Sequence, residues 1–533
     1  FFLEEEGLGT NLKSNYVKSA PKGSDKTEGF LRDIERTLLL ELDTNKPPPL
    51  TKKGKEIRQL EKKLHADPQH VVIPTDKTNS FLVVTTECYK EWVLNVLNEK
   101  AQVIDHKRLE EIYDEAIDLL NSLDETMSEK EFNFIKYTLR SKAIPTPKLL
   151  IKDHKKKKEN GDFPTRLIIP ATNFTAGFPR LGYTGIRKIF DKAKIKYKKL
   201  TIVQASDLKE NLETLGINKE THTIVSLDAI DMYPSINYDM VEKAVKYYGR
   251  NLPPADKEKV KKCLAMIEFG MGNTLVTFRD KYYKYGTLNA VEDKRLTIGG
   301  YESAWLADLV AAFVLEHTPE AFENSIYHGI YRDDGLIVFK GKMTKRDVIK
   351  WLQDFQQRSN AACGCENLQF TAELWGKENK DYKSERVEVN TKDFFPYLDI
   401  AMRWNESNEL TFGVYMKDNH VLKYLNSGSQ HTKSCFRAIP SGVFQRLSKL
   451  TTITPENRNL PISDIYPDHA AALRTAGLTE TFPTLEEISK EKKANTSLTI
   501  NKADSRSRQT YFCIGVSDTW KKPVHTILKN SRE

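Results

Sequence analysis

The chain has 533 residues, more than one hydrophobic core usually supports, so we expect about two to four cooperating subdomains. Its 39% hydrophobic and 10% aromatic content are those of a globular protein and exclude a wholly disordered chain. The net charge is +8, and no apolar run of about 18 residues is present, which excludes a membrane-spanning helix. The first residue is Phe1 and not Met, so we expect a fragment or a processed form.

Positive charge is concentrated at residues 152–158 (KDHKKKK) and 187–199 (RKIFDKAKIKYKK). Clustered cations attract a phosphodiester backbone, although a solvated lysine-rich loop explains such runs equally well. The six cysteines are scattered, and Cys363-Gly-Cys365 has the wrong spacing for a zinc knuckle. We therefore expect reduced thiols and an intracellular protein, nuclear or cytoplasmic, with no targeting signal visible in the sequence.

The first half of the chain is predicted to be helical with two short β-rich regions. In chain order we expect a helical region at 27–66 interrupted by Pro47-Pro48-Pro49, a hairpin at 70–84, amphipathic helices at 87–143, and a proline-punctuated stretch at 145–179 with a strand at 166–169.

The second half alternates strands and helices. We expect a strand from 222, a turn closed by Pro234 and a helix, then a Gly-Gly entry into an apolar helix at 296–316, a hairpin at 328–340, a helix at 344–361, strands around 368–374, two antiparallel strands at 394–415, and a polar tail beyond about 486.

Two adjacent acids stand at the tip of the predicted 328–340 hairpin. Asp333 and Asp334 lie between strands apolar enough to be buried, where like charges and desolvation make such a pair costly. A divalent cation removes that cost, and so does simple exposure at a surface turn. A third acid, Asp228, lies within the apolar strand TIVSLDAI, where turn chemistry is absent.

Three acids on neighbouring strands suit phosphoryl transfer. That reaction uses two metal ions about 4 Å apart that clamp the attacking and leaving oxygens. Because magnesium prefers carboxylate oxygens and substrate phosphates, we expect Mg²⁺, or Mn²⁺ in its place, at these acids.

The same acids resemble the conserved motifs of reverse transcriptases. Residues 228–233 (DAIDMY) resemble motif A, an acid followed by an aromatic, and residues 331–334 (YRDD) resemble the YxDD box of motif C. Residues 299–303 (GGYES) resemble motif B, in which a glycine precedes a serine by four positions. The order A, B, C is kept over more than 100 residues, from 228 to 334.

Flanking segments resemble Penelope-like element reverse transcriptases, which are relatives of telomerase catalytic subunits. They are VIPTDK at 72–77, PKLLIKDHK at 147–155 with RLIIP at 166–170, FPYLD at 395–399, YLNSGSQH at 424–431, and IPSG at 439–442. The resemblance covers roughly residues 70–475. It departs at Ala304, where many families have proline, and at Thr78, where a glycine is usual. Residues 476–533 show no GIY-YIG nuclease, which Penelope-like proteins often carry.

The resemblance implies an α+β fold with the right-hand arrangement of polymerases. We expect an N-terminal helical region at 1–69, fingers at 70–215, a palm with an antiparallel sheet at 216–400, a mostly helical thumb at 401–480, and an extension at 481–533. The implied activity is that of an RNA-directed DNA polymerase, a retrotransposon enzyme with an RNA template, a DNA primer or target DNA, and dNTPs as partners. No membrane is expected, and the sequence does not indicate an oligomeric state.

Roles for individual residues follow from the same resemblance. The catalytic and metal-binding set is Asp228, Asp333 and Asp334, with the backbone carbonyl of Ala229; Tyr233 would exclude a 2′-hydroxyl. The set for dNTP binding is Lys77, Lys152, Arg166, Tyr233 and Gly299. The set for template and primer is Gly300, Ser303, Tyr331, Phe395, Tyr397, Leu398, His431 and Arg446.

Two other functions remain open on the sequence. The chain could be a related polymerase that accepts NTPs, either an RNA-dependent RNA polymerase or a domesticated reverse transcriptase. It could also be a catalytically inactive scaffold that binds nucleic acid. Single residues also have a structural interpretation beside the functional one. A lysine is often a surface cation, and an aromatic residue after a strand is often part of the core.

Overall fold

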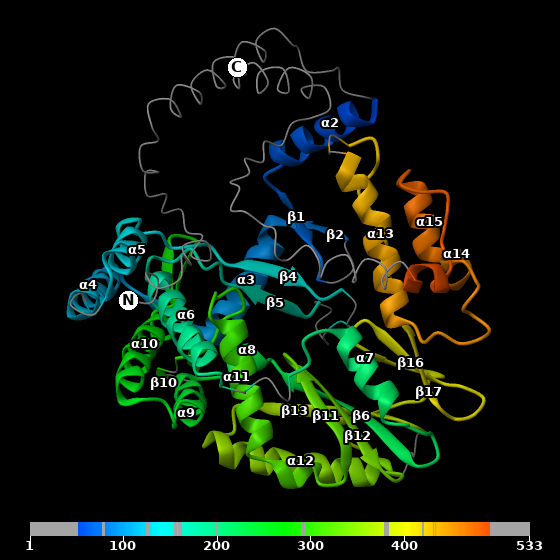
Figure 1. Cartoon of the computed structure of the whole chain (residues 1–533). Coiled ribbons are helices and arrows are strands. Elements are labelled where there is room, and N and C mark those ends of the chain that lie inside the picture. Colours follow the sequence, from blue (N-terminus) through cyan, green and yellow to red (C-terminus); the bar gives the residue numbers. More distant parts are fainter. Residues whose placement is uncertain are drawn as a thin grey trace, which may run out of the picture. The chain divides into compact units, whose positions relative to one another are not determined.

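The computed structural model in Figure 1 describes residues 52–490, with short gaps at 77–79, 124–126, 154–156, 158–162, 196, 198–200, 289–290, 293, 378–382, 418–419, 430 and 432. The described residues belong to two compact units. The first comprises residues 68–411 and contains all three acids, and the second comprises residues 52–67 and 412–490.

A five-stranded sheet forms the centre of the first unit. Its strands are β6 (His222–Ile230), β11 (Ser325–Tyr331), β12 (Asp334–Lys340), β13 (Gln369–Trp375) and β14 (Val387–Asn390). They are ordered β11-β12-β6-β13-β14, and every neighbouring pair is antiparallel except β13 with β14. The β-branched and aromatic residues of these segments favour a pleated, buried surface.

One face of this sheet packs against helices. Val225, Leu227 and Ala229 alternate along β6 and belong to the main core, together with residues of α11 (Ser303–Glu316) and α12 (Lys345–Cys363). Side chains in a strand alternate between faces, so Asp228 points to the opposite face. The helices therefore determine which face of β6 carries its acid.

The segments before β6 form helices and contribute strands to three small antiparallel sheets, one of which is completed by β7 and β8 from later in the chain. The helices are α3 (Thr86–Lys100), α4 (His106–Leu123), α5 (Glu129–Arg140), α6 (Gly177–Lys192) and α7 (Ala205–Thr214). The sheets are β1 (His70–Pro74) with β2 (Phe81–Thr85), β4 (Lys148–Ile151) with β5 (Thr165–Ile168), and β3 (Ala101–Ile104) with β8 (Lys281–Tyr285) and β7 (Leu275–Phe278).

Further elements of the first unit lie between β6 and α11 in sequence and after β14. They are α8 (Met232–Ser235), α9 (Tyr238–Tyr248), α10 (Pro254–Gly272), and the short pair β9 (Thr287–Leu288) and β10 (Val291–Glu292), followed by β15 (Phe394–Tyr397) and β16 (Ile400–Trp404). The strand β17 (Leu410–Val414) completes the β15-β16-β17 sheet at the boundary of the units.

Apart from the end of β17, the regular elements of the second unit are helices in its described part. It contains α2 (Lys52–Ala66), α13 (Lys433–Leu450), α14 (Ile462–Ile465) and α15 (Pro467–Thr475). Its core includes Leu447, Ile462, Leu485 and Ile488. Across the described residues of both units, none of the helices is long and apolar enough to cross a membrane.

The expected α+β class is confirmed, and so are the hairpins at 70–84 and 328–340. Two predictions of elements were wrong. Residues 101–104, expected within a helical stretch, form β3, because they pair with β8 far along the chain. The stretch 394–415 forms three strands and not two, because the chain reverses at Leu398 as well as after Trp404. The division into fingers, palm and thumb stays a prediction, and residues 1–51 and 491–533 lie outside the described residues.

Gly299 allows a close backbone approach just before α11. Its φ is +120°, and a Cβ at this position would collide with the carbonyl oxygen of Ile169, the residue after β5. The Ile169 amide donates a hydrogen bond to the Ile298 carbonyl at 2.9 Å. The end of β5 and the entry to α11 are therefore held together by backbone atoms.

We expect Gly299→Ala to lower the free energy of unfolding by about 3 kcal/mol, because a disfavoured φ and a steric collision add together. Gly216→Ala is the matched control, since Gly216 has φ +59° but a methyl group added to it would meet nothing within 4 Å. It should cost only about 1 kcal/mol. Urea denaturation of both variants measures the difference, and equal losses would contradict the close approach at Gly299.

Candidate active site

A row of four side chains crosses one end of the five-stranded sheet. Tyr331 on β11 pairs with Asp334 on β12, Asp334 pairs with Asp228 on β6, and Asp228 pairs with Thr371 on β13. Directly opposite residues of antiparallel strands share a face, so these four side chains form one line. The line lies on the face opposite α11 and α12, and the structure thus brings Asp228 and Asp334 together as the sequence predicted.

Asp333 lies beside this row in the two-residue turn between β11 and β12. Its carbonyl accepts a hydrogen bond from the Ala229 amide at 2.9 Å, which ties the turn to the residue after Asp228. The Asp333 side chain is half-buried. All three predicted acids and Ala229 therefore belong to one small region of two adjacent strands.

The donor chemistry of this region fits a divalent cation. Asp228 and Asp334 place two like charges opposite each other, an arrangement that destabilises a sheet by roughly 0.2–1 kcal/mol. A cation between them would replace repulsion with coordination, and Mg²⁺ prefers carboxylate oxygens. Within the described residues, however, no three His, Cys, Asp or Glu side chains converge closely enough to form a complete metal site. The backbone brings the three acids together, whereas their side chains do not form a closed arrangement.

The turn is attached to helix α11 by Arg332. This residue has φ +58°, in the left-handed region that tight hairpin turns use. Its guanidinium forms an ion pair with Asp308 and donates a hydrogen bond to the Ala304 carbonyl at 2.6 Å. Helix α11 thereby fixes the turn that carries Asp333.

Tyr233, in α8, lies near the same turn. Burial raises the pKa of its hydroxyl, and the charges that act on it include those of Arg332, Asp308, Asp333 and Arg166. A neutral phenol is therefore present at neutral pH. The Tyr233 hydroxyl is close enough to feel the charges of both Asp333 in the turn and Arg166 on β5.

Tyr397, in β15, contacts the acidic strand directly. Its hydroxyl donates a hydrogen bond to the Asp334 carbonyl at 2.8 Å. Burial raises the pKa of Tyr397 well above its usual range, and the Asp334 charge adds to the shift. Leu398 follows at the hairpin tip with φ +52°, half-buried. Phe395 is fully buried and stacks on Trp375 at 5.7 Å between ring centroids, so it is part of the core.

Arg166 is held by an acid on a neighbouring hairpin. Its Nη1 lies 3.2 Å from Asp76 Oδ2, and the Asp76 amide donates to the Ile151 carbonyl at 2.7 Å. Lys152 is half-buried, and its amide donates to the Pro164 carbonyl at 2.9 Å. Lys77 lies outside the described residues. Binding of dNTPs by Lys152 and Arg166 stays a prediction.

The predicted motif B residues contact the chain's own atoms. Gly299 approaches Ile169, and a Cβ on Gly300 would collide with the Ser303 and Glu302 side chains. Ser303 is 1% exposed, and its hydroxyl donates to Glu302 Oε1 at 3.3 Å. Burial raises the pKa of Glu302. The predicted approach of these glycines and Ser303 to a template stays a prediction.

The predicted thumb residues belong to the second unit. His431 is exposed, and its Nδ1 lies 3.1 Å from Ser429 Oγ. Arg446 is exposed on α13, where its charge opposes the rise that burial causes in the pKa of Tyr424. Contacts of His431 and Arg446 with a duplex stay predictions.

Comparison with solved structures gives telomerases as similar folds. The Candida albicans telomerase in complex with a TWJ fragment of telomeric RNA is 10% identical, with a TM-score of 0.45 over 91% of this chain and 71% of that chain. The Candida tropicalis apo telomerase is 9% identical, with a TM-score of 0.42 over 95% of this chain and 80% of that chain. The Candida tropicalis telomerase in complex with a TWJ fragment of telomeric RNA is 10% identical, with a TM-score of 0.41 over 86% of this chain. The match covers 64% of that chain, so this chain spans less than two thirds of its length.

At the level of sequence, no protein-family model and no curated protein matches the chain. With TM-scores below 0.5, the structural similarities assign no activity to it. The functional assignment therefore depends on the geometry around the three acids.

Sequence reasoning missed Arg332, Asp308 and Asp76. One signal was present, because Asp308 is the only charged residue between Ser303 and Leu315 of an otherwise apolar helix. A lone acid of this kind needs a partner when the helix is packed against a sheet. Its partner Arg332 stands in the variable position of the YxDD box, 24 residues after Asp308. Asp76 had no comparable signal, because its partner is about 90 residues away.

We expect the double variant Asp228→Asn/Asp334→Asn to unfold at a higher temperature than the unmodified protein in EDTA, because it removes a like-charge pair worth roughly 0.2–1 kcal/mol. Magnesium should then raise the melting temperature of the unmodified protein and leave that of the variant unchanged. Thermal melts with and without Mg²⁺ test both points. An equal rise in both proteins would contradict metal binding at these acids.

We also expect Arg332 and Asp308 to be thermodynamically coupled. A double-mutant cycle with Arg332→Gln and Asp308→Asn in urea denaturation should give about 1 kcal/mol, a value already reduced for solvent screening of this partly exposed pair. The exposed pair Arg358–Asp354 on α12 is the control and should give a smaller coupling. Equal couplings would show that the contact with α11 adds nothing to an ordinary surface ion pair.

Proposed function

We propose that the chain is an RNA-directed DNA polymerase of the Penelope-like type, which extends a DNA primer on an RNA template with dNTPs. The observation that carries the proposal is the pairing of Asp228 with Asp334 across β6 and β12, with Asp333 in the adjoining turn. This pairing supports the motif A and motif C resemblance, because it brings two segments more than 100 residues apart to one end of one sheet.

The acids would act as ligands and not as proton-transfer groups. Asp228, Asp333 and Asp334 would hold the metal ions, assisted by the Ala229 carbonyl. When bound, two divalent cations supply the charge that stabilises the transferring phosphoryl group and its leaving oxygen. The chain's own part is placement: β6 and β12 set the spacing of the acids, while Arg332 holds the turn that bears Asp333 and Tyr397 holds the start of the strand that bears Asp334.

Arg166 and Tyr233 would select and orient the nucleotide. The planar guanidinium of Arg166 can donate two parallel hydrogen bonds to a phosphate, and Asp76 holds it in position. The charges of Arg166 and Asp333 both act on the Tyr233 hydroxyl, so the tyrosine ring would lie close to both the triphosphate and the metal ligands. There it would limit the space for a 2′-hydroxyl.

A primer-extension assay on an RNA template, with dNTPs in one arm and NTPs in the other, tests this function. We expect extension with dNTPs and Mg²⁺, and its loss in Asp333→Asn/Asp334→Asn, with duplex binding retained. Incorporation of NTPs alone would favour the RNA polymerase alternative. Duplex binding without extension by the unmodified protein would favour the inactive scaffold, and extension by the double variant would refute the metal assignment.

We further expect Tyr233→Ala to raise the ratio of NTP to dNTP incorporation by roughly tenfold, since removal of the ring admits the 2′-hydroxyl. Single-nucleotide incorporation kinetics give this ratio from the two values of kcat/KM. Tyr331→Ala is the matched control, because Tyr331 is an aromatic residue of the same site that lies in the cross-sheet row. An unchanged ratio in Tyr233→Ala would remove Tyr233 from sugar selection.

A further inference from the structure

The end of helix α6 lies beside the start of helix α10. A Cβ added to Gly270, near the end of α10, would collide with Pro179, near the start of α6. At the other end of the pair, a Cβ added to Gly249, the C-cap of α9, would lie 3.7 Å from Phe190 of α6. The two helices therefore run antiparallel, and Figure 1 shows α6, α9 and α10 in one group.

Two basic stretches of the chain meet where these helices adjoin. Residues 187–194 contain four cations and one acid, and residues 250–262 contain five cations and two acids. Nine cations against three acids leave a charge of +6, compared with +8 for the whole chain. Because like charges that folding brings together repel, such a cluster destabilises the folded chain until an anion offsets it.

The acids of the two stretches offset only part of this charge. Asp191 lies 3.8 Å from Arg187 on α6, and Asp256 lies 3.8 Å from Lys259 on α10, which leaves Glu258. In the part of the chain that the structure describes, five cations of the two stretches have no ion pair with an acid. They form the basic junction: Lys194, Arg250, Lys257, Lys261 and Lys262.

Arg250 is held in place without an acid. It is exposed, its Cζ lies 4.0 Å from the centre of the Tyr247 ring, and its Nη1 donates to the Tyr247 carbonyl at 2.8 Å. A guanidinium has five N–H donors in a planar fork that matches the oxygens of a phosphate. Because the Arg250 side chain is already ordered, binding a phosphate would cost it less conformational entropy than it would cost an extended lysine.

Aromatic rings near the junction are used in packing. Tyr197 is 2% exposed and packs against Tyr248, with 6.0 Å between ring centroids. The Tyr247 ring contacts both Phe313, at 5.5 Å between centroids, and Arg250. Proteins that bind single strands stack the bases on accessible aromatic rings. A duplex keeps its bases stacked inside and presents its phosphates, so it suits a surface whose exposed groups are cations.

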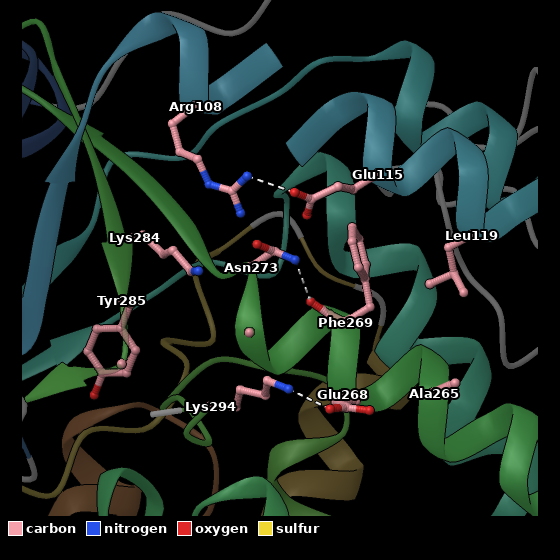
Figure 2. Close-up of a pocket in the computed structure, with 12 residues that line it drawn as sticks. Arg108, Glu115, Leu119, Ala265, Glu268, Phe269, Asn273, Lys284, Tyr285 and Lys294 are labelled. Carbon is pink, nitrogen blue, oxygen red and sulfur yellow. Dashed lines mark hydrogen bonds and ion pairs between the residues drawn. The ribbon is translucent and has the colours of Figure 1, made fainter. Parts of the chain in front are cut away.

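The other end of α10 is different. It lines the cleft in Figure 2, where Glu268 of α10 forms an ion pair with Lys294 and Glu115 of α4 accepts from Arg108 at 2.7 Å. The α10 cations without ion pairs therefore gather at the start of the helix. None of them belongs to the metal-binding or nucleotide-binding residues assigned above.

We propose that the basic junction binds the phosphodiester backbone of a nucleic-acid duplex. The contact would be independent of sequence, because cations bind phosphates, which carry no sequence information directly. Its energy would come largely from the release of counterions from the duplex, so binding would weaken steeply with salt. RNA and DNA duplexes share this chemistry, and the contact needs neither the three acids nor a nucleotide.

Binding is tested by fluorescence anisotropy of the full chain with a duplex of about 20 base pairs at several salt concentrations. EDTA is present, so that metal-dependent binding at the three acids does not contribute. We expect Arg250→Gln/Lys257→Gln/Lys261→Gln to weaken duplex binding roughly tenfold at constant salt, because three phosphate contacts are lost. The slope of log Kd against log salt should fall by about 2 to 3 in the same variant.

The control variant is matched in charge. Arg358→Gln/Lys345→Gln/Lys350→Gln also removes one arginine and two lysines, all from α12, and should leave both the affinity and the slope unchanged. Equal effects of the two triple variants would reflect net charge alone and would overturn the proposal. Should loss of the contact between Arg250 and Tyr247 unfold the chain, Lys257→Gln/Lys261→Gln tests the same surface, with a fall in slope of about 2.

Further ligands identify the partner. A similar loss for RNA and DNA duplexes supports a backbone contact common to both, and a loss confined to one of them identifies that duplex as the occupant. The proposal is overturned if a single strand loses as much affinity as the duplex, or if the variant loses binding to phosphatidylserine vesicles and keeps that to the duplex. Because the binding assay needs no catalysis, a failure of the proposed polymerase activity would leave its result unaffected.

Discussion

The antiparallel pairing of β6 with β12 is the constraint on which the candidate site depends. It sets Asp334 opposite Asp228 and leaves the intervening turn to hold Asp333. A shift of one residue in this register would either send Asp334 to the helical face or turn Leu227 and Ala229 to the open face. The apolar alternation of β6, which the core formed with α11 and α12 requires, prevents that shift. Burial on one face of the sheet thus determines the chemistry on the other.

Three contacts from other elements maintain this arrangement. Arg332 attaches the turn to α11, Tyr397 donates to the Asp334 carbonyl, and the Ala229 amide donates to the carbonyl of Asp333. Each of these contacts uses a backbone carbonyl of the turn or a side chain next to it, and none of them uses a carboxylate oxygen of the three acids. The like charges can therefore stay close without the turn opening.

Much of this site was predictable from the sequence, because the acids stand in short segments with strong local patterns. The alternation of TIVSLDAI and the two apolar runs around Asp333 specify strands, and the strands carry the acids. The ion pairs Arg332–Asp308 and Arg166–Asp76 were not predicted, since no local pattern encodes a contact between distant side chains. For the same reason β3 was assigned to a helix, because its strand conformation depends on a partner, β8, that follows about 180 residues later. The full burial of Phe395 and Ser303 likewise depends on packing that only the assembled fold supplies.

The backbone contact at Gly299 bears on how the protein could close over a substrate. The hydrogen bond from Ile169 to Ile298 connects the strand that bears Arg166 to the loop that leads into α11, and α11 in turn holds the acidic turn through Asp308. Arg166 and the turn that carries Asp333 are thus linked through a short path of main chain and one ion pair. Any inward swing of the β4–β5 hairpin would be transmitted to the start of α11, so the position of Arg166 and the alignment of the acids would be mechanically coupled.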